Sequence, residues 1–219
     1  MQSGRDRLLD LEREFRLFGL RFEGSKLLDF GCGPGRFSLG LTGRFHSVVG
    51  VDVSLHTIEM AQLLARDKEG ITYRLNTEAD LHQFGDGEFD MVWSAYVLQH
   101  NPPWLTERYL AEFFRVLRPG GQLLFQMHGG PRSRILSILP QAIIYGPINW
   151  LRRRNASNAG RRVEKRWETY WIPPKAMRQL LATAGFVLQA YWREPDPQHE
   201  QGHLLSFWYY AIPVPGFTR

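Results

Sequence analysis

Short apolar segments alternate with helical patterns along residues 26–128. One of them, SVVGVDV, is almost continuously apolar, as are strands buried on both faces of a parallel sheet. Each strand-like segment leads through a turn into a helix-like one, the order found in βαβ units. The alternation predicts an α/β fold with a doubly wound parallel sheet and helices on both faces. We expect its strands at residues 26–30, 47–53, 71–76, 89–95 and 122–128.

The regular alternation stops after the last of these strands. Residues 129–172 contain scattered glycines and prolines, an apolar stretch and an arginine-rich run, but no clear strand–helix unit. Regularity returns with a helix that begins near two prolines and ends at Gly185. Two closing strands are predicted at 186–192 and 204–214. We therefore expect residues 129–172 to be an inserted segment that covers one end of the sheet.

Composition fits one globular domain over residues 1–219 that contains this insertion. Hydrophobic residues make up 43% of the chain and charged residues 22%, the usual proportions of a protein with a full core. Cys32 is the only cysteine, so we expect no internal disulfide, no metal site and a reducing, cytoplasmic environment. An amphipathic helix is predicted at 5–19, with no apolar core of signal-peptide length, and no apolar run is long enough for a membrane span.

The chain is basic, with a formal net charge of +5, and its cations are densest at residues 152–166. Such a run is compatible with nucleic acid, an anionic membrane surface or an acidic substrate. It is equally compatible with an arginine-rich composition that has no partner. The charge alone does not choose between these alternatives.

A glycine-rich turn, DFGCGPG, occupies residues 29–35, between the first strand and the first helix. Asp52 ends the second strand, 21 residues beyond Gly31, where a carboxylate accepts hydrogen bonds from ribose hydroxyls. Both features fit an adenosine-containing cofactor. The dinucleotide pattern G-x-G-x-x-G would need glycine where Arg36 or Ser38 stands. The turn is therefore not a dinucleotide fingerprint.

The stretch LLDFGCGPGRF closely resembles motif I of class I S-adenosylmethionine-dependent methyltransferases. Four further stretches match the family in order and spacing: VVGVDVS, TEADLHQFGDGEFDMV, VWSAYVLQH and VLRPGGQLLF. The resemblance covers about residues 25–128 and is to the small-molecule branch (methyltransferase types 11 and 25). It implies a Rossmann-like seven-stranded sheet of order 3-2-1-4-5-7-6 with strand 7 antiparallel. It also implies S-adenosylmethionine as methyl donor and S-adenosylhomocysteine as product.

The resemblance assigns roles to residues that match the family motifs. Asp29 is expected near the methionine amino group, Asp52 at the ribose hydroxyls and Val53 against the adenine. Glu78 takes the place of the acid that accepts from the adenine amino group, although the family usually has Asp there and Asp80 is close enough to compete. His82 and Gln83 also replace the usual Leu-Pro. The remaining expected cofactor residues are Gly31, Cys32, Gly33, Gly35, Ala79 and Ser94.

The stretch NPPW at residues 101–104 resembles a motif of enzymes that methylate exocyclic or amide nitrogens. In those enzymes the motif leaves strand four directly, whereas Asn101 lies 11 residues after Asp90. Two prolines before a helix, with Thr106 placed to cap it, also suit a helix start. We expect a turn here. Nucleic-acid or protein N-methylation remains the alternative function.

Two histidines follow strands four and five, where ligands of parallel sheets bind. A neutral imidazole is suited to remove a proton from a hydroxyl or ammonium acceptor, so His100 is the candidate general base. His128 would face the same crevice as a substrate-binding residue. Either histidine is also compatible with a structural role, as a wall of the cofactor pocket or a side chain that is satisfied by the backbone.

The insertion indicates what kind of acceptor the protein binds. Residues 135–151 are apolar and uncharged, and the basic run 152–166 follows them. Trp167, Tyr170 and Trp171 come next and are the candidate acceptor-binding residues. We expect a small, partly apolar, hydroxylated or aminated acceptor rather than nucleic acid, and peripheral contact with an anionic membrane is a further option. A cofactor-binding protein without turnover is the alternative from a different class.

Overall fold

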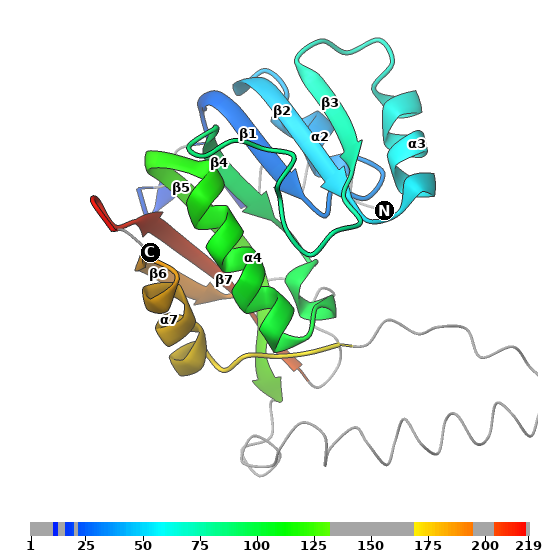
Figure 1. Cartoon of the computed structure of the whole chain (residues 1–219). Helices are drawn as coiled ribbons and strands as arrows, with labels where there is room; N and C mark the ends of the chain where they lie inside the picture. The colour runs from blue at the N-terminus through cyan, green and yellow to red at the C-terminus, as the bar shows by residue number, and fades with distance from the viewer. Residues whose placement is uncertain (1–10, 13–15, 20–21, 132–168, 195–203, 218–219) are drawn as a thin grey trace, which may run out of the picture.

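The computed structural model describes residues 11–12, 16–19, 22–131, 169–194 and 204–217. A seven-stranded sheet runs through them in the order β3-β2-β1-β4-β5-β7-β6 (Figure 1), which confirms the predicted fold class. The strands are β1 (Gly24–Phe30), β2 (Phe45–Asp52), β3 (Ile71–Leu75), β4 (Phe89–Ser94), β5 (Leu117–Pro131), β6 (Phe186–Arg193) and β7 (Leu204–Pro213). The helices are α2 (Arg36–Leu41), α3 (Leu55–Leu64), the 3₁₀ helix η1 (Leu98–His100), α4 (Pro103–Val116) and α7 (Pro174–Thr183).

The five strands β1 to β5 are parallel, and β7 is antiparallel to both of its neighbours. Asp29 on β1 is in register with Trp93 on β4, which is in register with Leu124 on β5. The carboxyl ends of the parallel strands therefore meet at one edge, the lower end of the molecule in Figure 1. Ligands of such sheets bind at this edge.

Each face of the sheet is covered by helices. On one face, α4 and α7 bury Leu110, Phe113, Met177 and Leu181 against the sheet. On the other, α2 packs beside β2 and α3 beside β3, where Ile58 and other residues form a smaller apolar cluster. Apolar residues on both sides explain why the central strands read as continuous hydrophobic runs.

Several predicted boundaries were wrong. Helix α4 begins at Pro103, four residues before the helix expected at Glu107, and Pro102 occupies its N-cap position. Thr106 therefore does not cap the helix but is buried inside it, where its backbone N–H donates to the Pro102 carbonyl at 3.1 Å.

Strand β5 continues to Pro131, so the first three residues of the predicted insertion extend the strand instead. Residues 132–168, which include the apolar stretch, the basic run and Trp167, lie outside the described residues, as does most of the predicted N-terminal helix. Within the described part of the chain, no helix is long and apolar enough to cross a membrane.

Candidate functional site

The glycine-rich turn joins β1 to α2 and is held against β2. The backbone N–H groups of Gly31 and Cys32 donate to the Val51 carbonyl at 2.8 and 2.9 Å. Gly31, Gly33 and Gly35 all have positive φ angles, of 75°, 52° and 81°. A chain with side chains at all three positions would be strained in this conformation.

The three glycines are needed for different reasons. A Cβ on Gly31 would overlap the Val97 side chain, and one on Gly35 would overlap the Tyr73 hydroxyl. At Gly33 a Cβ would meet nothing within 4 Å among the described atoms. Packing of the protein itself thus excludes side chains at two of the glycines, whereas Gly33 borders open space where a ligand can approach the backbone.

Asp52, at the end of β2, is fixed toward the open side of this turn. One carboxylate oxygen accepts from the Gly33 N–H at 2.9 Å. The other accepts from the Ser54 N–H at 2.9 Å and from the Thr57 hydroxyl at 3.1 Å. Three of about four acceptor positions of the carboxylate are used. The side chain is only partly buried and retains a lone pair for a ligand hydroxyl.

Asp29, at the end of β1, lies buried beneath the same turn. The Ser38 hydroxyl of α2 donates to its carboxyl at 2.5 Å. Burial raises the pKa of Asp29 from 3.8 to about 7, the Ser38 hydrogen bond opposes this, and the charge of Asp52 adds to it. A cation placed beside Asp29 would reverse this effect, because it favours the charged carboxylate.

Three other predicted cofactor residues differ in what they present to a ligand. The Cys32 side chain is buried with Ile58 and Tyr73, and burial raises the pKa of its thiol, so the side chain faces away from the open side of the turn. Val53 is 59% exposed beyond the end of β2, where a ligand can contact its side chain. The Ser94 hydroxyl at the end of β4 is fully buried and has no hydrogen-bond partner among the described residues. An unpartnered buried hydroxyl at this edge fits a site that is completed by a bound molecule.

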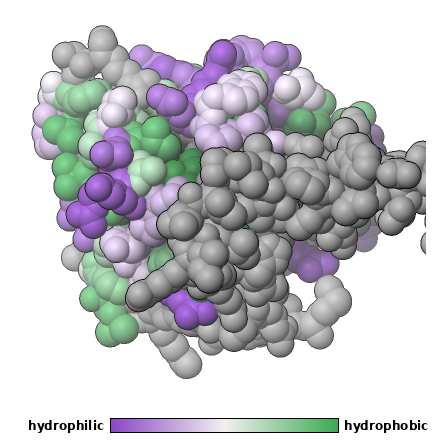
Figure 2. All heavy atoms as spheres, turned by 90° about the horizontal axis from the view of Figure 1, so that it is seen from below, coloured by the Kyte–Doolittle hydropathy of each residue, from purple (hydrophilic) through white to green (hydrophobic). Residues whose placement is uncertain are grey.

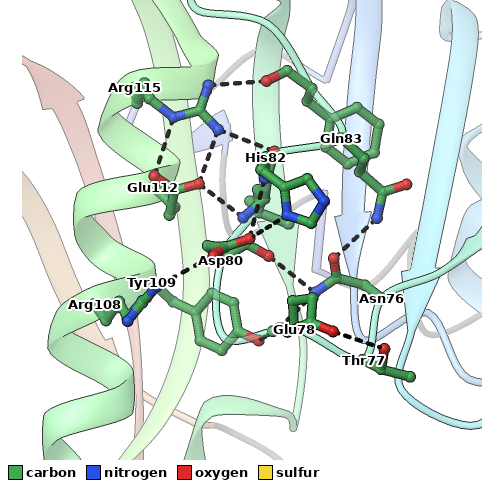
Figure 3. A network of polar contacts seen from close by, with 12 residues as sticks. Asn76, Thr77, Glu78, Asp80, His82, Gln83, Arg108, Tyr109, Glu112 and Arg115 are labelled. Carbon is green, nitrogen blue, oxygen red and sulfur yellow. Dashed lines mark hydrogen bonds and ion pairs between the residues drawn. The ribbon is translucent and has the colours of Figure 1, made fainter.

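Glu78 and Asp80 are both candidates for the acid that binds adenine, and the two carboxylates differ in their contacts. Asp80 accepts from the His82 ring at 2.6 Å and from Arg108 at 3.1 Å (Figure 3), and the His82 hydrogen bond lowers its pKa. Glu78 is exposed, and its carboxylate contacts the Thr77 hydroxyl at 3.5 Å. The acid of the pair that is open to a ligand is therefore Glu78, and Ala79 follows it on the partly buried side of the loop.

The loop that carries Glu78 is attached to α4. The Tyr109 hydroxyl donates to the Glu78 carbonyl at 2.8 Å, and the Asn76 side chain donates to the same oxygen at 3.1 Å. The Gln83 amide donates in turn to the Asn76 side chain at 2.9 Å. Loop residues 75–78, 80, 82 and 83 line a shallow hollow of about 420 Å³.

Arg115 of α4 forms hydrogen bonds with the second half of this loop. It donates to the Leu81 and Phe84 carbonyls, each at 2.9 Å, and to the Asp86 carboxylate. It also donates to Glu112 (Figure 3). The hydrogen bond to Glu112 is the main reason that the pKa of Arg115 is raised. The helix that follows strand four thus holds in place a loop that precedes it by about thirty residues.

His100 lies in η1, six residues beyond the end of β4, and is partly buried. Asn101 caps the end of η1, Pro102 precedes α4 and Pro103 begins it, so the expected turn is confirmed. Trp104 is 63% exposed on the first turn of α4. The NPPW stretch therefore starts a helix and does not extend strand four.

The described end of the predicted lid lies between the two histidines. The Tyr170 N–H donates to the Gln99 carbonyl of η1 at 2.7 Å, and the Ile172 N–H donates to the His128 carbonyl at 2.9 Å. Trp171 is buried and packs near Gly130. The structure thus brings Tyr170 and Trp171 to His128 and η1.

The His128 side chain is fully buried and shares a 2.7 Å hydrogen bond between Nδ1 and the Ser206 hydroxyl of β7. This contact fits the structural role that the sequence left open for His128. On the coloured part of the face in Figure 2, hydrophilic and hydrophobic residues are interspersed rather than separated.

A family profile described as a methyltransferase domain matches residues 28–125, the span that contains the glycine turn, Asp52, the Glu78 loop and η1. Residues 28–125 therefore match a methyltransferase domain, and the observed strand order is the one that the resemblance implied.

Several methyltransferases are similar to this domain in sequence. A ubiquinone biosynthesis O-methyltransferase of Alkalilimnicola ehrlichii is 31% identical over 119 residues, 53% of this chain and 47% of the relative. A malonyl-[acyl-carrier protein] O-methyltransferase of Erwinia billingiae is 34% identical over 141 residues, 62% of this chain and 52% of the relative. The chain spans about half the length of these curated relatives.

A solved structure shows the same fold. It is a magnesium protoporphyrin IX methyltransferase from Synechocystis PCC 6803 with bound S-adenosylhomocysteine, which aligns with a TM-score of 0.65. The alignment covers 96% of this chain and 84% of that protein at 19% identity.

Sequence reasoning missed a second group of buried polar residues in the methyltransferase domain. Glu194, just after β6, accepts from the Trp208 indole at 2.6 Å and from the Tyr96 hydroxyl at 3.1 Å. Tyr96 follows β4 and, at 62°, is the one non-glycine residue of the described chain with a positive φ. Gln126 lies fully buried in the middle of β5. The only sequence signal was a polar residue inside the apolar segment QLLFQMH.

Proposed function

We propose that this protein transfers a methyl group from S-adenosylmethionine to a small, partly apolar acceptor with a hydroxyl or amino group. The observation that carries the proposal is the pair of carboxylates around Gly33: Asp52, fixed by three hydrogen bonds, and Asp29, buried under the turn. The backbone at Gly33 between them is open to a ligand. Two acids of different exposure suit a ligand with both ribose hydroxyls and an ammonium group.

Each part of the site would bind one part of the cofactor. Asp52 would accept from the ribose hydroxyls, Asp29 from the methionine ammonium and Glu78 from the adenine amino group. Val53 would pack on the adenine ring, and Ser94 would gain the hydrogen bond that its buried hydroxyl lacks. The bound cofactor supplies an electrophilic methyl group on a sulfonium.

The protein's own contribution to transfer is alignment of the acceptor and exclusion of water. His100 would hold the proton that leaves the acceptor oxygen or nitrogen. Tyr170 and Trp171, which the backbone attaches to η1 and β5, would form the wall against which the acceptor packs. The rest of the predicted insertion, residues 132–172, as an acceptor lid, and a cytoplasmic location, belong to the same proposal.

The small-molecule part of the proposal is supported by the curated relatives, whose names refer to ubiquinone biosynthesis and to malonyl-[acyl-carrier protein]. It is also supported by the position of NPPW at a helix start, away from the end of β4 where nitrogen-methylating enzymes carry it. We do not propose nucleic acid as the substrate. Contact of the basic run at 152–166 with an anionic membrane would be compatible with a lipid-like acceptor.

Isothermal titration with S-adenosylhomocysteine tests cofactor binding. Asp52→Asn should weaken binding by about 1–3 kcal/mol, the cost of hydrogen bonds lost to a charged acceptor. Asp67→Asn is the matched control, because Asp67 is exposed and pairs only with neighbouring Arg66 among the described residues. Binding of NADH, with no binding of S-adenosylhomocysteine, would overturn the proposal. Release of that product from S-adenosylmethionine with at least one member of an acceptor panel separates an enzyme from a binding protein without turnover.

A further inference from the structure

Gln126 on β5 is a polar side chain that is buried in the sheet. It has no exposed surface, and neither its amide oxygen nor its amide nitrogen has a hydrogen-bond partner among the described residues. A buried polar group without a partner costs about 1–3 kcal/mol, and Gln126 has two such groups. Folded proteins retain few groups of this kind, and those that they retain call for a ligand or another reason.

The register of the sheet places Gln126 on the cofactor side of the fold. Asp29, Trp93 and Leu124 are in register on β1, β4 and β5, so their side chains lie on one face. Gln126 is two residues further along β5 and shares this face, because side chains alternate along a strand. It is displaced from Asp29 by two strand spacings, about 10 Å, and by about 7 Å toward the carboxyl edge.

This displacement matches the position of an acceptor beside the cofactor. The methionine end of the cofactor would lie at Asp29, at the same edge of the sheet. A molecule that receives the methyl group must lie further along that edge, toward β5. The Gln126 side chain has no exposed surface, so the aromatic residues that cover it would have to separate for its amide to contact an acceptor at that position.

Aromatic side chains surround this position. Trp208 is the β7 partner of Gln126 in the register, and its ring lies 5.2 Å from the Trp93 ring. The Phe37 ring of α2 lies 5.6 Å from Trp93, and the Tyr96 ring lies 5.9 Å from Trp208. These rings pack against one another in a buried apolar cluster, so an apolar ligand that separated them would find the amide as a polar anchor.

The backbone at Tyr96 supports a functional role for this region. A tyrosine with a φ of 62° is in a conformation that is unfavourable for a residue with a side chain. The hydrogen bond from its hydroxyl to Glu194 helps to hold it there. Strained residues that are held in this way are concentrated at ligand sites.

We propose that Gln126 recognises the acceptor, through an uncharged group in which a hydrogen-bond acceptor and a donor lie side by side, such as a carboxamide. The amide of Gln126 presents the complementary donor and acceptor. An anionic group suits the position less, because it would only accept and because the Glu194 carboxylate is held by Trp208, the register partner of Gln126. This inference rests on the proposed methyltransferase function and adds a specificity determinant to it.

Three fragments test the inference in the presence of S-adenosylhomocysteine: benzamide, acetophenone and benzoate. Ligand-observed NMR titration of the wild-type protein should show benzamide bound about tenfold more tightly than the other two, the scale of one or two net hydrogen bonds. Gln126→Met and Gln126→Leu should abolish that preference. Gln122→Met is the matched control, because Gln122 lies on the same strand and face but near its other end, and it should keep the preference.

Two further measurements complete the test. Titration with S-adenosylhomocysteine alone should give equal affinity for the wild type and Gln126→Met, and a wild type that does not bind it would refute the proposed function separately. The melting temperature of Gln126→Met without ligand should equal or exceed that of the wild type, because two unpartnered groups are removed. Absence of a benzamide preference, or a preference retained by both Gln126 variants, overturns the inference. A clear loss of melting temperature in both variants also overturns it, because Gln126 would then be a structural residue.

Discussion

The Asp29→Asn substitution should stabilise the ligand-free protein above pH 7 while it weakens cofactor binding. Asp29 is buried, and its pKa is raised from 3.8 to about 7, chiefly by burial. Between these two pH values the folded protein keeps a proton that the unfolded chain has lost. Stability therefore falls as the pH rises from about 4 to about 7, and the loss is complete above pH 7.

The size of the effect follows from the pKa. Three pH units at about 1.36 kcal/mol each mean that ionised Asp29 costs the fold on the order of 4 kcal/mol. Asparagine removes the charge, and its side-chain oxygen still accepts from Ser38. Its amide nitrogen gains no evident partner, which costs about 1–3 kcal/mol. The expected net gain is roughly 1–3 kcal/mol above pH 7, or several degrees in melting temperature for a protein of this size.

Thermal unfolding of wild type and Asp29→Asn from pH 4 to pH 8.5 measures this gain. At pH 4 the wild-type carboxyl is largely protonated, so the variant should be equal to the wild type or less stable. The difference should grow in favour of the variant as the pH rises. Asp67→Asn, at an exposed carboxylate, is the control and should show no such trend.

Cofactor binding supplies a second, opposite readout. An ammonium group beside Asp29 favours the carboxylate, so binding at pH 6 should release a proton, detectable by titration in buffers of different ionisation enthalpy. Wild-type affinity should rise from pH 5.5 to pH 7.5. In Asp29→Asn the affinity should fall by about 1.5–3 kcal/mol at pH 7.5, the scale for a charged hydrogen bond, and lose its pH dependence. A variant that is destabilised equally at all pH values, with unchanged cofactor binding, would refute the reasoning.

The remaining predictions concern the turn, the loop and the base. Gly31→Ala should lower the melting temperature strongly, since its Cβ would overlap Val97 in a positive-φ conformation, whereas Gly33→Ala should cost only about 1–2 kcal/mol of stability and mainly weaken cofactor binding in titration. Arg115→Met should lower the free energy of unfolding by about 2–3 kcal/mol in urea, because two loop carbonyls lose a charged donor. An unchanged urea midpoint would show that Arg115 does not stabilise the loop. His100→Ala should reduce methyl transfer about a hundredfold or more without a change in cofactor affinity, and the reverse pattern would make His100 a wall of the cofactor site.

The sequence by itself determined the parts of this protein that depend on neighbouring residues. The glycine turn after β1, the acid at the end of β2 and the order of strands and helices are all local patterns, and the structure has them where they were expected. The helix start at Pro103 was local too, but Thr106 was a misleading signal. Its preference for caps was overridden, because two prolines begin the helix earlier and the residue packs inside.

The tertiary structure alone decided the contacts between segments that are distant in the chain. Asp80 pairs with Arg108, whereas Glu78 is available to a ligand. Arg108 belongs to α4, a helix that follows the loop, so contacts with that helix distinguish the two acids. Gly31 and Gly35 are required by side chains from other strands and loops rather than by a ligand alone.

The polar group around Glu194 joins three segments that the sequence keeps far apart: the turn after β4, the end of β6 and strand β7. Gln126 is a polar residue in an apolar strand and is buried in the sheet, where β7 pairs with β5. Local patterns specify elements, whereas burial and pairing across the sheet determine which polar side chains are left for a ligand.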